Sequence, residues 1–416
     1  MTLPRGLRAL RHRDFRLFFI GQGVSQVGTW LQIIATSWLV YQLSGSTFML
    51  GLAAFSIQIP FLVLAPLAGV FVDRLDRRRV LLATNTIAAL QATTMFSLVA
   101  LGHVQAWHLV AGNLVLGLVN ACDAPARQTV LIQLVGGARG DLANAIALNS
   151  VVMNTARFVG PMLGGALIAA FGERWGFGVN ALSYAVVLTA LWRIAPSPRV
   201  HAPLERGLAR QLAAGARYAY GFLPSRCALL LLAATSLTTG SYVALMPWFA
   251  REVFHGGSDT LGLLVSAAGL GALSGMVYLA LRPGVRGLFR LIGGTAAVAG
   301  VGLAAFAFSS TLWLALPALY MVGLGLLLTA ASTNTVLQTI VPDELRGRVA
   351  AFYVASFLGM SPLGALAVGW ISERIGPPAT LAACGAAALL AAAIYYTRLP
   401  AIRREIRPLY EQLGAV

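Results

Sequence analysis

The chain alternates long apolar segments with short polar connections. Each apolar segment has about 20 residues or more, the length at which an α-helix crosses the hydrocarbon core of a bilayer. The sequence accommodates twelve such spans, near residues 15–42, 48–72, 80–102, 107–130, 143–171, 176–197, 226–250, 260–283, 288–309, 311–338, 349–372 and 378–398. We therefore expect an all-α membrane protein with twelve transmembrane helices.

One connection is longer than the others and divides six spans from six. Residues 198–225 contain three prolines and several arginines. Within them, the stretch from Leu204 to Phe222 alternates apolar and basic residues, which is compatible with a helix lying on the inner leaflet. A solvated linker is the alternative. The expected organisation is an N-terminal six-helix bundle over 1–197, a cytoplasmic linker over 198–225 and a C-terminal six-helix bundle over 226–416.

The two halves resemble each other weakly, as in transporters built from repeats. Three short patterns recur about 200 residues apart and in the same order. Gly45-Ser46-Thr47 and Gly51 parallel Gly257-Ser258-Asp259 and Gly262; Thr129-Val130-Leu131 parallels Thr335-Val336-Leu337; Pro161, Gly164 and Glu173-Arg174 parallel Pro362, Gly364 and Glu373-Arg374. We interpret the halves as two homologous, pseudo-symmetric six-helix bundles.

Composition agrees with a membrane protein, and the placement of charge predicts its orientation. The chain of 416 residues is 58% hydrophobic and 11% charged, well below the charged fraction of soluble domains. All thirty basic residues are arginine. With the N-terminus inside, all of them lie on the cytoplasmic side except Arg157, Arg174, Arg251 and Arg374, as the positive-inside rule requires. The net charge of +16 thus reflects topology, with both termini cytoplasmic and no nucleic acid partner.

Several chemistries are excluded. The three cysteines, Cys122, Cys227 and Cys384, are isolated and lack metal or redox spacing. Without lysine the chain has no P-loop and no Schiff-base nucleophile. The five histidines form no constellation with a carboxylate. We expect no cofactor, no metal and no enzymatic activity; a membrane-embedded transferase and a non-transporting scaffold are the alternatives from other classes.

A short charged turn joins the second and third spans. It reads Gly69-Val70-Phe71-Val72-Asp73-Arg74-Leu75-Asp76-Arg77-Arg78-Arg79. Carboxylates are stabilised at helix N-termini, and ion pairs gain strength near a low dielectric. The turn is therefore predicted to grip and release neighbouring helix ends, through Gly69, Asp73, Arg74, Arg77 and Arg78. An arginine cluster that only sets topology is the alternative.

This turn resembles the GxxxDRxGRR signature of the major facilitator superfamily, with Asp76 in place of a glycine, and the resemblance covers the whole chain. Within the superfamily, the sequence is similar to the branch that contains the enterobactin exporter and macrolide efflux proteins. Three segments carry this resemblance, in the order Asp123-Ala124-Pro125-Ala126-Arg127-Gln128, Asn154-Thr155-Ala156-Arg157 and Gly160-Pro161. The resemblance implies the major facilitator fold, a gating role for the turn, alternating access, and export across the bacterial cytoplasmic (inner) membrane.

The fourth span carries its polar groups on one face. At 100° per residue, Asn113, Asn120, Asp123 and Arg127 fall within an arc of about 80°. Asp123 and Arg127 also form an i,i+4 pair. One interpretation is a self-neutralising surface pair. The other is that Asp123 exchanges partners between Arg127 and Arg77 and carries a proton, which makes Asp123 and Arg127 candidate gating and proton-relay residues.

Arg157 is the one charge deep within a span, where it costs about 2.5 to 3.5 kcal/mol on insertion scales. We expect it to face the substrate pathway, or else to be a structural arginine bonded to neighbouring helices. Proline and small residues follow it, at Gly160, Pro161, Gly164 and Gly165. They resemble the GPxxGG element of antiporters in the superfamily, although close helix packing also explains them.

A polar stripe runs along the first span, and a milder one occurs in the second half. Gln22, Ser25, Gln26, Thr29, Gln32 and Thr36 share one face, and unsatisfied amides are costly in hydrocarbon. We expect these polar groups to line a substrate pathway. Its candidate residues are Gln22, Gln26, Thr29, Gln32, Asn113, Asn120, Arg157, Thr235, Thr239 and Tyr242. Hydrogen bonding between helices without substrate contact is the alternative.

No carboxylate is placed at mid-membrane, so an anionic or neutral substrate is expected rather than a cation. The sequence thus predicts a monomeric secondary transporter that exports a small organic molecule, such as a siderophore or macrolide, by proton antiport. A proton-independent permease or importer, or a lipid-related flippase of the same fold, is the alternative.

Overall fold

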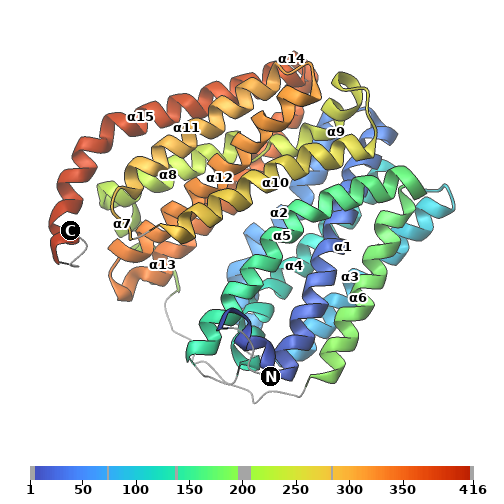
Figure 1. Cartoon of the computed structure of the whole chain (residues 1–416), viewed down its shortest axis with the longest axis horizontal. Helices are drawn as coiled ribbons and strands as arrows, with labels where there is room; N and C mark the ends of the chain where they lie inside the picture. The colour runs from blue at the N-terminus through green and yellow to red at the C-terminus, as the bar shows by residue number, and fades with distance from the viewer. Residues whose placement is uncertain (1–4, 73–74, 136–138, 195–207, 283, 413–416) are drawn as a thin grey trace. The chain divides into compact units, whose positions relative to one another are not determined.

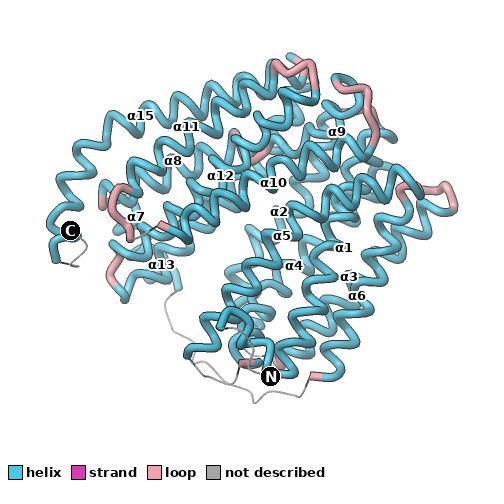
Figure 2. Tube along the Cα trace, viewed as in Figure 1, coloured by secondary structure: helices cyan, strands magenta, loops and turns pink. Residues whose placement is uncertain are grey.

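In the computed structural model the described part of the chain is built from helices and short connections. The structure describes residues 5–72, 75–135, 139–194, 208–282 and 284–412, and every regular element in these ranges is a helix (Figure 2). The all-α expectation is confirmed for this part of the chain.

Helices follow one another with short connections in both halves (Figure 1). The first half contains η1 (Arg5–Arg11), α1 (Arg13–Ser44), α2 (Thr47–Val72), α3 (Arg77–Ala100), α4 (Ala106–Leu134), α5 (Arg139–Phe171) and α6 (Arg174–Arg193). The second contains α7 (Leu208–Gly221), α8 (Leu223–Thr238), η2 (Tyr242–Leu245), α9 (Met246–Trp248), η3 (Phe249–Val253), α10 (Ser258–Leu281), α11 (Leu288–Ala307), α12 (Leu312–Ile340), α13 (Asp343–Val354), η4 (Ala355–Gly359), α14 (Met360–Ile375) and α15 (Pro377–Gln412).

Within the described residues, ten helical stretches are long and apolar enough to cross a membrane. The predicted spans outside that set are 15–42 and 80–102, which form α1 and α3. Both helices carry amides and hydroxyls that lower their hydropathy, and many of these groups bind other helices rather than lipid.

The chain divides into two compact units. The first contains Met1–Gly45, Ser56–Leu204 and His255–Ser266; the second contains Ser46–Phe55, Glu205–Phe254 and Ala267–Val416. Two helices therefore contribute to both units: α2 begins in the second and continues in the first, and α10 does the reverse.

In the first unit, α1 packs against α5 and α6, and α3 packs against α4 and α6. One end of this unit holds an apolar cluster that includes Phe15, Phe18, Leu81 and Leu191. In the second unit, α11 packs against α12 and α15, and α8 packs against α14 and α15. The core there is larger and draws on most of these helices.

The segment expected to lie on the leaflet or to be a solvated linker forms α7, which packs against protein. Gly215 has no side chain, and a Cβ there would lie 2.8 Å from the Cβ of Arg348 on α13. The Tyr218 hydroxyl donates to the carbonyl of Ile340 at 3.1 Å, and Tyr220 meets Phe352 edge-on. Thus α7 is docked on α13 and the end of α12, while 195–207 lie outside the described residues.

Two predicted spans are interrupted rather than continuous. The span expected at 226–250 forms α8, then η2, α9 and the π-helical turn η3. The span expected at 349–372 contains the π-helical turn η4 between α13 and α14. Hydrophobic periodicity did not predict these breaks, because a π-helical turn adds one residue to a helical turn without changing the apolar composition of the span. π-helical turns are frequent at functional sites.

Asp76, the departure from the superfamily signature, caps α3. Its carboxylate accepts hydrogen bonds from the backbone N–H groups of Arg78 and Arg79 at 3.0 and 3.3 Å. Its φ of −66° is open to any residue, so the turn does not require glycine here. The side chain satisfies donors that helix starts otherwise leave unpaired.

We predict that Asp76→Ala lowers stability by about 1 kcal/mol and that Asp76→Gly costs only a few tenths. Asp76→Asn, which keeps an acceptor oxygen, should match the wild type. Thermal unfolding of the purified variants in one detergent gives the ranking. Equal midpoints for the Ala and Asn variants would show that the cap contributes nothing.

Candidate functional site

The charged turn between α2 and α3 ties α3 to the end of α6. Arg78 donates through Nε to the carbonyl of Leu191 at 2.8 Å and through Nη2 to that of Trp192 at 2.9 Å. Carbonyls in the last turn of a helix lack intrahelical partners, and cations are favoured there. Gly69 lies in the last turn of α2 and Arg77 begins α3. Asp73 and Arg74 lie outside the described residues.

Asp123 is the centre of a buried polar cluster within the first unit. Its Oδ1 accepts from the hydroxyl of Thr84 at 3.0 Å and from the amide of Asn85 at 3.1 Å. Its Oδ2 lies 3.4 Å from Nη2 of Arg127, and Nη1 of Arg127 donates to the Gln22 side chain at 3.2 Å.

The cluster joins α1, α3 and α4 through one carboxylate and one guanidinium. Asp123 is only 8% exposed, so the interpretation of a surface pair is wrong: the predicted i,i+4 pair exists, but it is buried. The exchange of Asp123 between Arg127 and Arg77 stays a prediction.

A second buried network joins α6, α1 and α3. The amide of Asn180 donates to the Gln32 carbonyl oxygen at 2.7 Å, and the Gln32 amide donates to the Gln91 oxygen at 2.9 Å. Small residues make room for it: a Cβ on Gly112 would lie 2.6 Å from Nε2 of Gln91. Both ends of the Gln32 amide are thus used within the unit, as in the interhelical alternative.

The other predicted pathway residues of the first unit differ in exposure. Gln26 and Thr29 are half-buried, and the Thr29 hydroxyl donates to the carbonyl of Ser25 in its own helix. On α4, Asn113 is buried and Asn120 is exposed. Gln26, Thr29 and Asn120 are therefore more accessible than Gln32.

Arg157 lies half-buried on α5, four residues before Pro161. The glycines that follow pack against two different helices. A Cβ on Gly160 would lie 2.5 Å from that of Trp30, and one on Gly164 would lie 3.1 Å from the Cα of Leu31, both on α1. Gly165 instead meets the first turn of α10, whose Ser258 hydroxyl donates to the Gly165 carbonyl at 3.2 Å.

Nearly the same contact recurs between α2 and α14 in the second unit. The Thr47 hydroxyl donates to the Gly369 carbonyl at 3.1 Å. A Cβ on Gly51 would lie 2.5 Å from the Ala365 carbonyl oxygen, just as one on Gly262 would lie 2.5 Å from that of Pro161. Both of these contacts therefore pair a hydroxyl-bearing residue and a glycine one turn later with a small-residue surface.

Glu373 adds a charged component to the α2–α14 contact. Its Oε1 accepts from the Ser46 hydroxyl and, at 3.3 Å, from the backbone N–H of Phe48. The carboxylate thus caps the start of α2, where a negative charge is favoured.

The predicted pathway residues of the second half are deeply buried. The hydroxyls of Thr235 and Thr239 donate to carbonyls one turn earlier in their own helix, both at 2.7 Å. Tyr242 lies where α8 gives way to η2 and is 6% exposed. The nearby Ser236 hydroxyl donates to the carbonyl of Phe357 in η4, so it satisfies a carbonyl at the π-helical turn.

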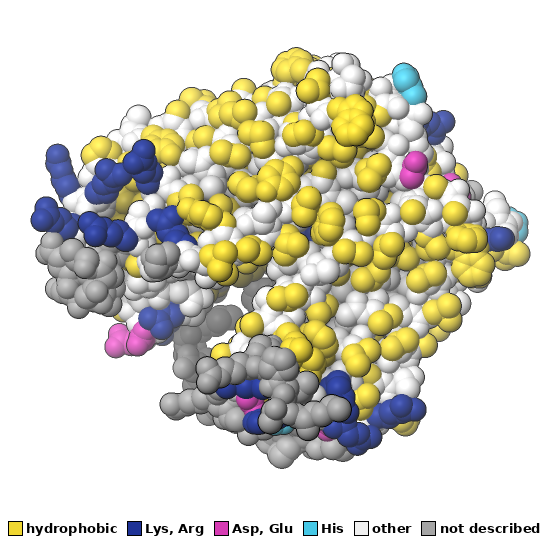
Figure 3. Space-filling model, viewed as in Figure 1, with side chains coloured by type: hydrophobic (Ala, Val, Ile, Leu, Met, Phe, Trp, Pro, Cys, Tyr) yellow, Lys and Arg dark blue, Asp and Glu magenta, His cyan; other side chains and the backbone are white. Residues whose placement is uncertain are grey.

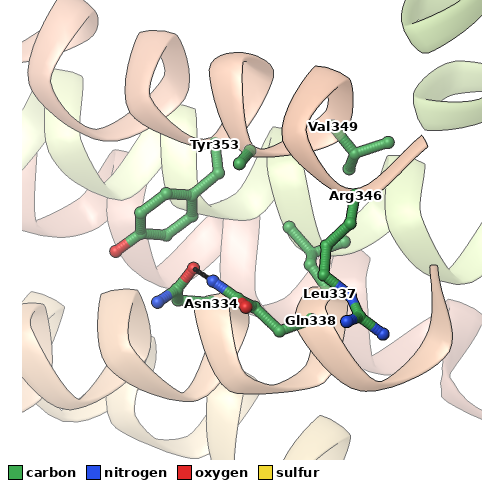
Figure 4. A pocket seen from close by; sticks show the side chains of 7 residues that line it. Asn334, Leu337, Gln338, Arg346, Val349 and Tyr353 are labelled. Carbon is green, nitrogen blue, oxygen red and sulfur yellow. Dashed lines mark hydrogen bonds between the residues drawn. The ribbon is translucent and has the colours of Figure 1, made fainter. Parts of the chain in front are cut away.

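A small hollow of about 10 Å³ opens between α12 and α13 (Figure 4). Side chains of Asn334 and Gln338 on α12 face Arg346 and Tyr353 on α13. Arg346 is paired with Asp343 at 2.5 Å, so the charge of this side chain is already balanced.

Sequence reasoning missed one buried carboxylate at the start of α5. Asp141 binds Nε of Arg8 at 3.2 Å, Nη2 of Arg11 at 2.6 Å and Nε2 of His12 at 3.0 Å. These contacts dock η1 and the start of α1 onto α5. The sequence offered one signal for this contact, namely that an acidic residue, Asp141, could pair with the arginine-rich N-terminus. Among the described residues, no cluster of His, Cys, Asp or Glu could hold a metal.

We predict that Gln32→Ala lowers stability by about 1 to 3 kcal/mol, because it leaves the buried amides of Asn180 and Gln91 without partners. Gln26→Ala, a half-buried neighbour on the same helix, is the matched control and should change little. Thermal unfolding in detergent, alongside transport, separates the roles. Unchanged stability with lost transport for Gln32→Ala would contradict a structural role.

Solved transporter structures share this fold. The nucleoside transporter NupG superposes with a TM-score of 0.69 at 14% identity, covering 93% of this chain and 99% of that one. A bacterial homologue of the iron transporter ferroportin superposes with a TM-score of 0.69 at 17% identity, covering 92% and 98%. At these identities the likeness shows the fold alone.

Curated relatives match at similar coverage. The multidrug efflux pump Tap of Mycolicibacterium fortuitum is 27% identical, covering 89% of this chain and 93% of its own length. The enterobactin exporter EntS of Citrobacter koseri is 26% identical, covering 95% and 94%. Residues 5–410 match the family described as transmembrane secretion effector. The chain therefore belongs to the transmembrane secretion effector family of the major facilitator superfamily, as a multi-pass membrane transporter and not an enzyme.

Proposed function

We propose that this transporter exports a small organic molecule from the cytoplasm by alternating access, in exchange for protons. Two relatives named as a multidrug efflux pump and an enterobactin exporter support the direction. The Gly160–Gly165 element, which resembles that of antiporters, supports exchange. The substrate class that fits is anionic or neutral, such as a siderophore or macrolide.

The proposed architecture has twelve spans. Six form a bundle over 1–197 and six over 226–416, joined by a cytoplasmic connection over 198–225 that includes α7. The excess of arginine on one side supports cytoplasmic termini in a bacterial inner membrane. We propose that a single copy of the chain is the working transporter.

The buried carboxylate of Asp123 is the observation that carries proton coupling. Its charged form is held by Arg127, Thr84 and Asn85, which belong to two helices. Protonation would remove its charge and weaken the bond to Arg127 while leaving the guanidinium beside Gln22. A proton can therefore change how α4 is tied to α1 and α3. Arg77 and Arg78 at the start of α3 complete the proposed gate, together with Asp73 and Arg74, which lie outside the described residues.

We propose that Arg157 sets the preference for substrate charge, with Gln26, Thr29, Asn113 and Asn120 as further pathway groups of the first half. An arginine within a span attracts anions and hydrogen-bond acceptors and repels cations. Gln22 is proposed to respond to substrate through Arg127. Thr235, Thr239 and Tyr242 complete the proposed pathway in the second half, next to the interrupted helix α8.

Transport into inverted membrane vesicles tests the proposal. With the vesicle interior acidified, we expect the protein to accumulate a labelled macrolide or catecholate siderophore, and an uncoupler to abolish the accumulation. Vesicles without the protein are the control.

Accumulation that persists with the uncoupler would contradict proton exchange and favour a proton-independent permease. Uptake only by right-side-out vesicles would contradict export.

A further inference from the structure

One end of the second unit gathers arginines from three helices. Arg226 lies in the first turn of α8, Arg290 in the first turn of α11, and Arg398 on α15, and all three side chains are exposed. Their chain neighbours Cys227, Phe289 and Leu399 pack in one apolar core, which places the three arginines around the same end of the unit. Figure 3 shows dark blue arginine side chains gathered near the C-terminal end of the chain.

The core beneath these arginines fixes the positions of their helices. The hydroxyl of Tyr396 donates to the carbonyl of Arg290 at 3.2 Å, and that of Tyr395 to the carbonyl of Phe289 at 3.0 Å. Both bonds join α15 to the start of α11. Arg398 and Arg290 therefore lie near the same end of the packed helices α15 and α11.

The level of this cluster along the helices is that of a membrane interface. Tyr396 is 38% exposed, and tyrosine favours the headgroup region, where its ring is in contact with acyl chains and its hydroxyl is solvated. α11 begins at Leu288 and α8 at Leu223, so Arg226 and Arg290 lie at the ends of apolar helices. Phospholipid phosphates occupy that same level.

Beyond this level α15 continues as an amphipathic helix. Leu399, Ile402 and Ile406 are buried in the core of the unit. Arg403, Arg404 and Arg407 are exposed and fall within an arc of about 100° on another side of the helix, at 100° per residue. This extension has three arginines and two acidic residues, Glu405 and Glu411, so it keeps a positive excess.

Within the part of the chain that the structure describes, the arginines of this cluster lack negatively charged partners, and this indicates the kind of ligand they bind. Among the described residues, the guanidinium groups of Arg290, Arg398, Arg403 and Arg404 have no ion-pair or hydrogen-bond partner, and Arg226 has only a 3.5 Å bond to the Tyr220 carbonyl. Guanidinium groups bind phosphate with paired N–H donors. Basic clusters beside a membrane helix attract anionic lipids by about 1 kcal/mol for each arginine.

We propose that Arg226, Arg290 and Arg398 form a binding site for the headgroup of an anionic phospholipid, with Arg403, Arg404 and Arg407 adding long-range attraction. The site lies outside the transport pathway and does not depend on the substrate. Its ligand is a membrane lipid with a negatively charged phosphodiester.

The test measures binding of phosphatidylglycerol to the purified full chain in a neutral detergent, by native mass spectrometry and by the rise in thermal midpoint. We expect the triple variant Arg226→Gln, Arg290→Gln, Arg398→Gln to bind phosphatidylglycerol about 100-fold more weakly than the wild type. The matched control, Arg13→Gln, Arg16→Gln, Arg193→Gln, removes three other exposed arginines and should bind within about threefold of the wild type.

Phosphatidylcholine and inorganic phosphate are the other probes, and neither should raise the midpoint of the wild type. Equal loss in the control variant would show attraction by net charge alone and overturn the site. An equal rise with inorganic phosphate would make it a general anion site and overturn the assignment to lipid. If the triple variant does not fold, Arg398→Gln alone should bind about fivefold more weakly, and unchanged binding would contradict the proposal.

Discussion

The constraint on which this structure depends is that a polar group inside a membrane-spanning helix must find a partner, because hydrocarbon supplies none. Asp123 meets the constraint in its most demanding form. A buried carboxylate without partners would cost several kcal/mol, and here Thr84, Asn85 and Arg127 surround it. The amides of Asn180, Gln32 and Gln91 meet the same constraint one layer further along the helices. These two clusters fix which faces of α1, α3, α4 and α6 meet.

The same constraint gives the protein places where contacts can be remade. Neutral amide chains have one good arrangement, whereas a carboxylate has two protonation states with different preferred partners. The contacts of α5 with α10 and of α2 with α14 are of another kind. They consist mainly of backbone and small residues, with hydroxyl bonds from Ser258 and Ser266 to α5 and from Thr47 to α14. Few bonds need to be broken to alter such a contact.

The sequence predicted the helical class and most helix positions, because twenty-residue apolar segments in a membrane have few alternatives. It also predicted the pairing of Asp123 with Arg127, which needs only helical spacing. It could not predict Thr84 and Asn85 as partners, nor that Gln32 would bind Asn180 148 residues away, because such contacts depend on how helices are rotated against each other. The capping role of Asp76 was not predicted, because the turn was compared with a signature that has glycine at this position. The ion pair of Asp141 with Arg11 was not predicted, because 130 residues separate the two in the sequence.

The central claim is that the charge state of Asp123 couples proton movement to transport. The direct measurement is proton flux, followed with an internal pH dye, when substrate is added to liposomes containing the wild type or Asp123→Asn. The amide keeps the size and an acceptor oxygen but cannot titrate. The account predicts substrate-driven proton movement in the wild type and its loss in Asp123→Asn, with downhill substrate exchange retained. Proton movement of wild-type size in Asp123→Asn would contradict it.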